Sequence, residues 1–225
     1  MFVSRSMAKK VTTVDPGTGL LEAQSLMQRL QIRHLPVVDA DRRLQGMITD
    51  RDIRSALPYE LAKGGGDQQE REKYAHLKVS DAMSTDLLTI SPTHTIQDAL
   101  LLIEQKKVGA LPVVDDAGIL VGILSVRDLL RAFINVLGIG QPGTLLCVLV
   151  EEKVGQLKKI VDIITEENIS FGSVLVARYW EKDKRAVFPY LLSNNVVRVK
   201  KRLKEAGFTL VDPMDWYIDQ LPDQE

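Results

Sequence analysis

Two phrases of the chain, GMITDRD at residues 46–52 and GILSVRD at residues 122–128, repeat the same polar groups at the same spacing. Each has a glycine, a hydroxyl residue three positions later, and then an arginine close to an aspartate. Glycine lets another molecule approach the backbone, and arginine at a helix N-terminus suits phosphate. An aspartate there can accept hydrogen bonds from ribose hydroxyls. The pattern favours two nucleotide sites, at Thr49, Arg51 and Asp52 and at Ser125, Arg127 and Asp128.

The same residues also fit a purely structural role. A hydroxyl residue followed three positions later by an acidic residue can form a capping box, in which side chains satisfy the backbone N–H groups at the start of a helix. Thr49 with Asp52 and Ser125 with Asp128 have this spacing, which needs no ligand. Both interpretations stay open at this point.

The two phrases belong to a longer internal repeat. A shift of 76 positions (Met83 minus Met7) superposes LPVVD at Leu35–Asp39 on LPVVD at Leu111–Asp115. Two copies are too few for a solenoid, so we expect a paired unit with internal pseudo-symmetry.

Each repeat changes its periodicity in a fixed order. Helical spacing comes first, and Thr95 with Asp98 resembles a capping box at the start of the second of these helices. Two short β-branched runs follow, and then another helical stretch. We expect strand, helix, strand, strand, helix in each repeat. The positions at helical spacing are Leu20, Ala23, Met27 and Leu30, and Ile96, Ala99, Leu100 and Ile103.

Two glycine-rich stretches act as connections. Residues 61–74, with three consecutive glycines and a run of charge, predict a mobile loop that leads into a solvated helix. Residues 138–143 match G-x-G-x-x-G, but they follow a predicted helix and precede a strand. A dinucleotide site needs the opposite order, so we expect a linker there.

The C-terminal segment has its own pattern. Strands are expected at TLLCVLV, at SVLVARYW and AVFPYLL around the turn EKDK, and at FTLV. Two helical faces separate them, one with Leu157, Ile160, Val161 and Ile164 and one with Val196, Val199, Leu203 and Ala206, which ends at Gly207. The order βαββαβ is the ferredoxin-like pattern.

Composition excludes several classes of protein. The 225-residue chain has a net charge of −1, which gives no general attraction to nucleic acid or anionic lipid. Its apolar runs are far shorter than the ~18 residues of a membrane span, and the start lacks the apolar region of a secretory signal. The basic run at residues 198–204 is expected to be a solvated helix face.

Single residue types give further expectations. Cys147 is the one cysteine and cannot form an internal disulfide, so we expect core packing and a cytoplasmic location. The three histidines lie far apart, which indicates no metal site. The aromatic residues Trp180, Phe188, Tyr190, Trp216 and Tyr217 are expected in the core or in subunit contacts.

The repeats resemble a tandem pair of CBS domains, a Bateman module, on the motifs "RHLP" and "GALP" and on both hydroxyl-x-x-Asp phrases. The resemblance implies clefts between the two units that bind AMP, ADP, ATP, or in some members S-adenosylmethionine or NAD. By position, Asp52 and Asp128 would bind ribose and the backbone near His34 and Ala110 would meet adenine. Thr49 and Ser125 would contribute hydroxyls, and Arg51 and Arg127 would bind phosphate.

The C-terminal segment resembles an ACT domain, a family of effector modules that pair side by side. The family's turn appears as Glu152 to Gly155, and Asn168 stands at its effector-contacting turn. The whole chain is similar to the acetoin-utilisation protein B family. The resemblance implies a mixed α/β (α+β) fold, two pseudo-symmetric CBS units followed by a ferredoxin-like βαββαβ ACT domain.

We expect a first CBS unit at residues 1–60, a linker at 61–78, a second CBS unit at 79–136, a linker at 137–143, an ACT-like domain at 144–212 and a tail at 213–225. The favoured function is a non-catalytic sensor of an adenosyl ligand that forms at least a homodimer and regulates another protein. The alternatives are a scaffold protein with empty clefts, and an enzyme, for which no base–nucleophile pair or metal set is visible.

The two clefts are expected to differ. The first phrase has Asp50 where the second has Val126, and a carboxylate there would repel phosphate. Ala8 stands where the family usually has a hydroxyl after Met7, which we assign to the edge of the first cleft. The first cleft also has Arg33-His34 in place of Gly109-Ala110. The second cleft is therefore expected to bind phosphate better.

Overall fold

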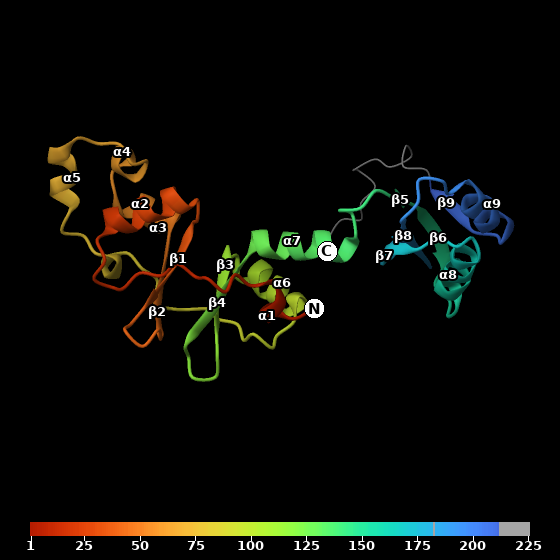
Figure 1. Ribbon diagram of the computed structural model, residues 1–225, viewed down its shortest axis with the longest axis horizontal. Coiled ribbons are helices and arrows are strands. Elements are labelled where there is room, and N and C mark those ends of the chain that lie inside the picture. The colour runs from red at the N-terminus through yellow and green to blue at the C-terminus, as the bar shows by residue number, and fades with distance from the viewer. Residues whose placement is uncertain (182, 212–225) are drawn as a thin grey trace. The chain divides into compact units, whose positions relative to one another are not determined.

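A computed structural model describes residues 1–181 and 183–211 of the chain (Figure 1). It divides into two compact units, Met1–Leu130 and Arg131–Glu225, called here the N-terminal and C-terminal units. The N-terminal unit contains the first copy of the repeat and most of the second. The boundary between the units falls within one helix, α7 (Val126–Leu137).

The two repeats fold alike. The first has α2 (Leu20–Leu30), β1 (His34–Val38), β2 (Leu44–Thr49) and α3 (Asp50–Ala56), and the second has α6 (Ile96–Lys106), β3 (Ala110–Val114), β4 (Leu120–Ser125) and α7. Both hairpins are antiparallel, and both shift register inside the LPVVD phrase, between Val37 and Val38 and between Val113 and Val114. The internal duplication is therefore confirmed down to the position of the irregularity.

The strand expected at the start of each repeat is reduced to a single bridge. Val14 pairs with Val37 and Ile90 pairs with Val113, both in parallel. Each bridge is followed two residues later by a proline, Pro16 or Pro92, which has no N–H to continue a ladder.

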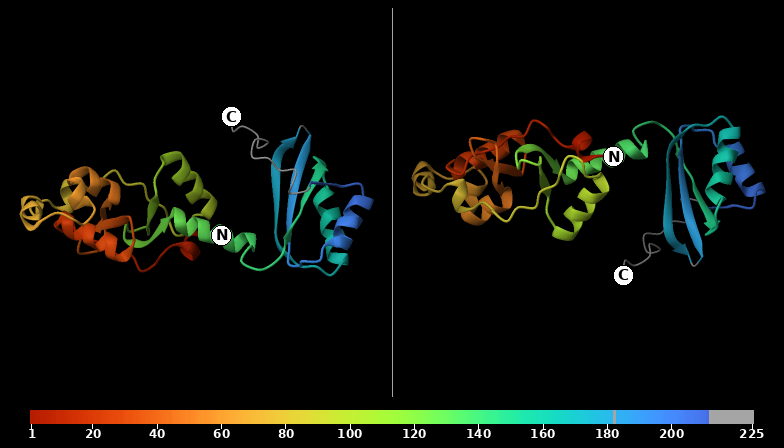
Figure 2. Two further views of the ribbon diagram at one scale, coloured as in Figure 1. Left: turned by 90° about the horizontal axis from the view of Figure 1, so that it is seen from above. Right: turned by 90° about the horizontal axis from the view of Figure 1, so that it is seen from below.

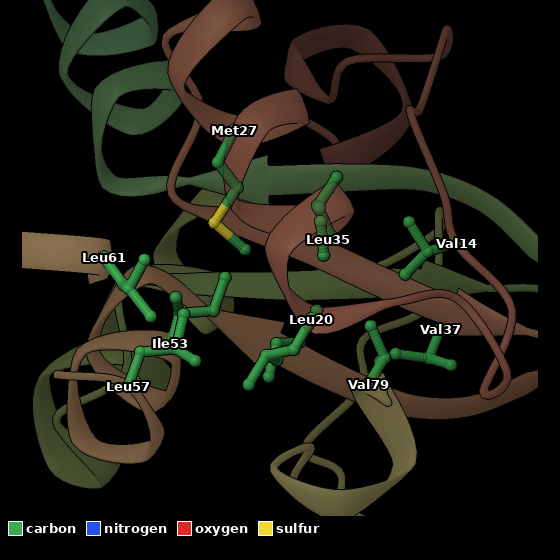
Figure 3. Close-up of a cluster of buried hydrophobic side chains, with 11 residues drawn as sticks. Val14, Leu20, Met27, Leu35, Val37, Ile53, Leu57, Leu61 and Val79 are labelled. Carbon is green, nitrogen blue, oxygen red and sulfur yellow. The ribbon is translucent and has the colours of Figure 1, made fainter. Parts of the chain in front are cut away.

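Three of the four apolar positions of helical spacing on α2 lie in the core of the first repeat, whereas Leu30 is 44% exposed. Leu20, Ala23 and Met27 are buried on α2 and pack against Leu35 and Ile48 of the hairpin. Figure 3 shows part of this cluster, with Ile53, Leu57 and Leu61 at one end and Val14, Val37 and Val79 at the other. The second repeat keeps the pattern with Ile96, Ala99 and Ile103 buried on α6.

The expectation of a mobile loop after the first repeat is only partly right. Pro58 ends the helical stretch that began at Asp50, and α4 (Tyr59–Ala62) buries Leu61 in the core at 1% exposure. The solvated helix is confirmed as α5 (Gln68–Tyr74), which has no buried residue, and η1 (Val79–Asp81) follows it.

The first residues of the chain pack on the second repeat. In α1 (Val3–Ser6) the Val3 N–H donates to the His94 carbonyl at 2.8 Å, and its side chain is fully buried. Ala8 forms an antiparallel bridge with Ile123 of β4. The N-terminal segment, assigned to the first repeat by its sequence, therefore completes the second one.

The C-terminal unit is one antiparallel sheet covered by two helices. Its strands are β5 (Thr144–Leu145), β6 (Cys147–Glu151), β7 (Phe171–Glu181), β8 (Lys184–Leu191) and β9 (Thr209–Val211). Strand β8 pairs with β5, β6 and β7, and β6 also pairs with β9. Helices α8 (Gln156–Glu166) and α9 (Val197–Glu205) cover the same face (Figure 2).

The single-residue expectations can be placed on this sheet. Cys147 is buried, and burial raises the pKa of its thiol to about 11, as expected for a packing residue. The basic run is α9, whose Val199 and Leu203 are buried while Arg202 pairs with Glu166 and Glu167. Phe188 and Tyr190 are buried, whereas Trp216 and Tyr217 lie outside the described residues.

The G-x-G-x-x-G stretch connects α7 to β5, as expected of a linker. Its glycines allow close approach of backbones, because a Cβ at Gly143 would lie 2.4 Å from the Leu191 carbonyl oxygen. At Gly138, which has a φ of +68°, a Cβ would lie 2.9 Å from Gly172.

The docking of residues 1–8 on the second repeat can be tested at Val3. We expect Val3→Ala to lower the free energy of unfolding by about 2 kcal/mol, because it removes buried methyl groups and leaves a cavity. Phe2→Ala is the control, since Phe2 is 57% exposed and should change stability by less than about 0.5 kcal/mol. Urea titration of the two variants measures the difference. Equal effects would contradict the docking.

Candidate functional site

The first hydroxyl-x-x-Asp phrase, called here the first box, lies where β2 ends and α3 begins. The Thr49 N–H and Oγ1 donate to Asp52 Oδ2 at 2.8 and 2.7 Å, and the Asp52 N–H donates to Thr49 Oγ1 at 3.3 Å. The structural interpretation of the phrase is thus correct. It leaves Asp52 Oδ1 without a hydrogen bond to the described part of the chain, so the same carboxylate keeps an acceptor for a ligand.

The second box has the same geometry where β4 meets α7. The Ser125 N–H and Oγ donate to Asp128 Oδ2 at 2.9 and 2.6 Å, and the Asp128 N–H donates to Ser125 Oγ at 3.3 Å. Arg51 and Arg127 are exposed on the first turns of their helices, next to these carboxylates. Guanidinium groups at a helix N-terminus suit a phosphate.

Residues near the two boxes meet at the centre of the N-terminal unit. His34 lies opposite Thr49 in the first hairpin, and Ala110 lies opposite Ser125 in the second. The His34 imidazole reaches across to Gly109, where an added Cβ would lie 2.7 Å from Nε2. A side chain at position 109 would make the His34 imidazole shift, and this contact joins the two hairpins.

The half-buried His34 has a shifted pKa. Burial lowers the pKa of the imidazole below its ordinary value near 6.5, and Arg33 acts in the same direction. The carboxylates of Asp50 and Asp52 oppose this shift but do not reverse it. The neutral imidazole is therefore favoured in the folded protein.

The hydroxyl missing at Ala8 belongs to the second box, which corrects the expectation that it weakens the first. Ala8 pairs with Ile123, two residues before Ser125. Its counterpart Ser84 exchanges backbone hydrogen bonds of 2.9 Å with Met47, two residues before Thr49. The segments that precede the two repeats are exchanged, so each box receives its neighbour from the other repeat.

The charge of Asp50 is also compensated. Its carboxylate accepts a hydrogen bond from Arg54 at 3.0 Å, one helical turn later. The carboxylate that was expected to repel phosphate therefore stands beside a cation. Of the three reasons for a weaker first site, the structure contradicts the one based on Ala8 and weakens the one based on Asp50.

Two cavities of the N-terminal unit lie beside the first repeat, and the smaller one is lined by Asp50, inside the first box. One of 640 Å³ runs along α2 between Thr13 and Ala40, and one of 310 Å³ lies among α2, α3 and α4. Within residues 1–181 and 183–211, no three His, Cys, Asp or Glu side chains gather to hold a metal ion. None of the described helices is long and apolar enough to cross a membrane.

The effector residues expected in the C-terminal unit are not brought together within one chain. Glu152 pairs with Arg185, and Gly155 has a φ of +92° at the start of α8. Asn168 follows the end of the same helix. Eleven helical residues span about 16 Å, so these groups cannot share one small ligand in one copy.

Sequence reasoning missed Ser84 and Gly109. Ser84 could have been noticed as the hydroxyl that aligns with Ala8, but its position beside the first box depends on the exchange of segments. Gly109 carries no signal of its own, because its φ is ordinary and its close neighbour is the His34 side chain.

The comparisons with known proteins cover the N-terminal part of the chain. The CBS domain profile matches residues 3–59 and 79–135. A CBS domain-containing protein of Dictyostelium discoideum is 34% identical over 137 residues, which are 61% of this chain and 94% of that protein. Homoserine O-acetyltransferase of Methanohalophilus mahii is 33% identical over 60% of this chain, but this region is only 25% of the enzyme.

Solved structures of CBS-domain proteins are also similar to about three fifths of this chain. A Vibrio cholerae protein assigned to acetoin utilization has 28% identity and a TM-score of 0.52, covering 62% of this chain and 95% of its own. CBSX2, solved in complex with AMP, has 27% identity and a TM-score of 0.50, covering 59% of this chain and 96% of its own.

The buried imidazole predicts a pH dependence of stability. As the pH falls below 6.5, the unfolded chain binds a proton at His34 before the folded chain does, so the free energy of unfolding falls. Above pH 6.5 this contribution is constant. We expect His34→Gln to remove this decrease in the free energy of unfolding below pH 6.5, measured by urea unfolding at a series of pH values. His76→Gln, at an exposed site, should leave the decrease unchanged. An unchanged slope in His34→Gln would contradict the assignment.

Proposed function

The chain belongs to the CBS domain family, and we propose that it is a non-catalytic regulatory protein that senses an adenosyl ligand of the AMP, ADP or ATP class. The observation that carries the proposal is the box that occurs twice with the same geometry. In the first box, the carboxylate that caps the helix keeps Oδ1 as an acceptor for a ribose hydroxyl. The complex of CBSX2 with AMP supports the choice of ligand class.

Each group around a box has a role in this proposal. Asp52 and Asp128 bind ribose, Arg51 and Arg127 bind phosphate, and the hydroxyls of Thr49 and Ser125 orient the carboxylates and contact the ligand. The backbone at His34 and Ala110 meets adenine. Ser84 adds a hydroxyl to the first site, since it pairs with Met47 beside Thr49.

The absence of catalysis is part of the proposal. The enzymes among the relatives share this region as a minor part of their length, 25% for homoserine O-acetyltransferase. A regulatory module attached to many different activities fits that distribution. S-adenosylmethionine and NAD remain alternative ligands, and a scaffold whose boxes only cap helices is the alternative function.

The C-terminal unit is proposed to be a ferredoxin-like, ACT-type module that supports a homodimer or binds a second effector. Its βαββαβ order and its single helix-covered face support this assignment. Because Glu152 and Asn168 lie at opposite ends of α8, an effector site would need residues from two copies. The buried thiol of Cys147 suits a cytoplasmic protein.

Loss of both carboxylates should abolish most of the nucleotide affinity. In Asp52→Ala combined with Asp128→Ala, we expect AMP binding to weaken about 10–150-fold, because each charged hydrogen bond is worth about 1.5–3 kcal/mol. Isothermal titration calorimetry measures the change.

A third capping box provides the matched control. Asp98 caps α6 with the geometry of Asp52, accepting from the Thr95 N–H and Oγ1 at 2.8 and 2.7 Å. Asp98→Ala should lose a similar cap, worth about 0.5–2 kcal/mol, without changing affinity. Equal AMP affinity of the natural protein, the double variant and Asp98→Ala would show that the boxes only cap helices.

The two sites are proposed to differ in the direction opposite to that expected from the sequence. The first site has the Ser84 hydroxyl and an Asp50 that is paired with Arg54, whereas the second has Ala8. One neutral hydrogen bond is worth about 1 kcal/mol, or roughly fivefold in affinity. Asp52→Ala alone should therefore weaken AMP binding more than Asp128→Ala alone, and the reverse order in calorimetry would contradict this.

A further inference from the structure

The smaller cavity of the N-terminal unit, 310 Å³ among α2, α3 and α4, is lined by polar residues that the second repeat lacks. At four lining positions the first repeat has a polar side chain, and the second repeat has an apolar residue or glycine. These positions are Gln24, Arg33, Asp50 and Arg54, and, after a shift of 76 positions, Leu100, Gly109, Val126 and Leu130. The cavity is therefore a feature of one repeat and not of the duplicated framework.

The segment that follows α3 closes one side of this cavity. Helix α4 lies beside α2 and α3 (Figure 1), and Ala62 and Lys63 at its end line the cavity. Gln24 Nε2 donates to the Leu61 carbonyl, which ties α4 to α2. In the second repeat the corresponding helix, α7, continues to Leu137, so the chain does not turn back there to form an equivalent wall.

The floor of the cavity is apolar and contains one buried amide. Met27 and Ile53 line it and are 4% and 1% exposed. Gln24 is 6% exposed, and its Oε1 accepts no hydrogen bond from the described residues. A buried amide oxygen without a donor is costly, because it has lost its hydrogen bonds to water. A ligand with a hydroxyl group would satisfy this oxygen.

The rim of the cavity is positively charged. Arg33, Arg54 and Lys63 are cations among its lining residues. The one acid among the described lining residues, Asp50, pairs with Arg54 at 3.0 Å. The Arg33 side chain forms no hydrogen bond or ion pair with the described residues, and Lys63 Nζ lies 4.2 Å from the centre of the Tyr59 ring without a paired acid. Three cations and one carboxylate favour an anionic group here.

The cavity lies on a different side of α3 from the carboxylate proposed to bind ribose. Successive residues of an α-helix are about 100° apart, so Asp52 lies about 200° around α3 from Asp50. Neither Thr49 nor Asp52 is among the residues that line the cavity. A ligand in the cavity would therefore leave the first box accessible.

We propose that this cavity is a second ligand site, for a small organic anion that carries a hydroxyl group, such as a hydroxycarboxylate. The carboxylate binds Arg33 and Lys63 at the rim, and the hydroxyl donates to Gln24 Oε1. A short apolar body packs on Met27 and Ile53. A volume of 310 Å³ is at the lower end of ligand cavities, which limits the ligand to a few carbon atoms. The inference goes beyond nucleotide sensing, and either can fail without the other.

The first test compares acids that differ by one hydroxyl group. We expect 2-hydroxyisovalerate or 3-hydroxyisovalerate to bind the natural protein with a dissociation constant of about 1 mM. Isovalerate, which lacks the hydroxyl, should bind about fivefold more weakly, because it leaves Gln24 Oε1 without a donor. Isothermal titration calorimetry measures all three. The absence of binding by both hydroxy acids, or affinities equal to that of isovalerate, would overturn the proposal.

The second test removes a cation from the rim. In Lys63→Gln we expect the better hydroxy acid to bind at least about tenfold more weakly, because a charged hydrogen bond is lost. Lys73→Gln is the matched control, since Lys73 is exposed on α5 and does not line the cavity. Both side chains are exposed, so the folds should survive. Equal weakening in the two variants would indicate general attraction to positive charge and would overturn the site.

A nucleotide phosphate is another source of an anionic group, and competition distinguishes it. Protein saturated with AMP should bind the hydroxy acid with unchanged affinity, and Lys63→Gln should bind AMP as the natural protein does. Displacement of the acid by AMP, together with weaker AMP binding in Lys63→Gln, would overturn the proposal, because the cavity would then belong to the nucleotide site. Binding of the acid without any binding of AMP would support this inference and contradict the proposed function.

Discussion

Each repeat depends on the turn between its second strand and the helix that follows. In this turn a hydroxyl residue at the end of the strand and an aspartate three residues later hydrogen-bond to each other's side chain and backbone N–H. At Thr49 and Asp52 the three hydrogen bonds fix the direction in which α3 leaves β2. Because one carboxylate oxygen accepts both bonds from Thr49, the other is held in place and accepts no hydrogen bond from the described residues. A structural cap thereby becomes a preorganised acceptor, and the helix N-terminus beside it favours an anion.

The rest of the N-terminal unit brings two such turns to one centre. The hairpins are related by the repeat, His34 fills the space that Gly109 leaves, and the segments before the repeats are exchanged between them. Because of this exchange, Ala8, which precedes the first repeat in the sequence, lies next to a strand of the second repeat. Each repeat therefore contains backbone pairings to the segment that precedes the other one, Met47 to Ser84 in the first and Ile123 to Ala8 in the second.

Duplication also allowed the two copies to diverge in their surroundings. A single proline at position 58 ends a helix in the first repeat and returns the chain over α2, while the second repeat extends its helix as α7. Positions covered by the chain in one copy are exposed and apolar in the other. The two copies thus keep one framework while the chain that follows each of them takes a different course.

The sequence alone determined the duplication, the helices and hairpins of each repeat, the capping boxes and the order of strands in the C-terminal unit. These features follow from periodicity and from hydrogen bonds between residues three or four positions apart, which are local. It did not determine that the leading strands shrink to single bridges, that Leu61 of the glycine-rich connection enters the core, or that Ala8 lies beside Ser125 rather than Thr49. The contact between His34 and Gly109 was equally invisible, because the two residues lie 75 positions apart (109 minus 34). Such contacts form only when the chain packs. They depend on which apolar surfaces, distant in the sequence, are buried against each other, and the spacing of neighbouring residues does not reveal this.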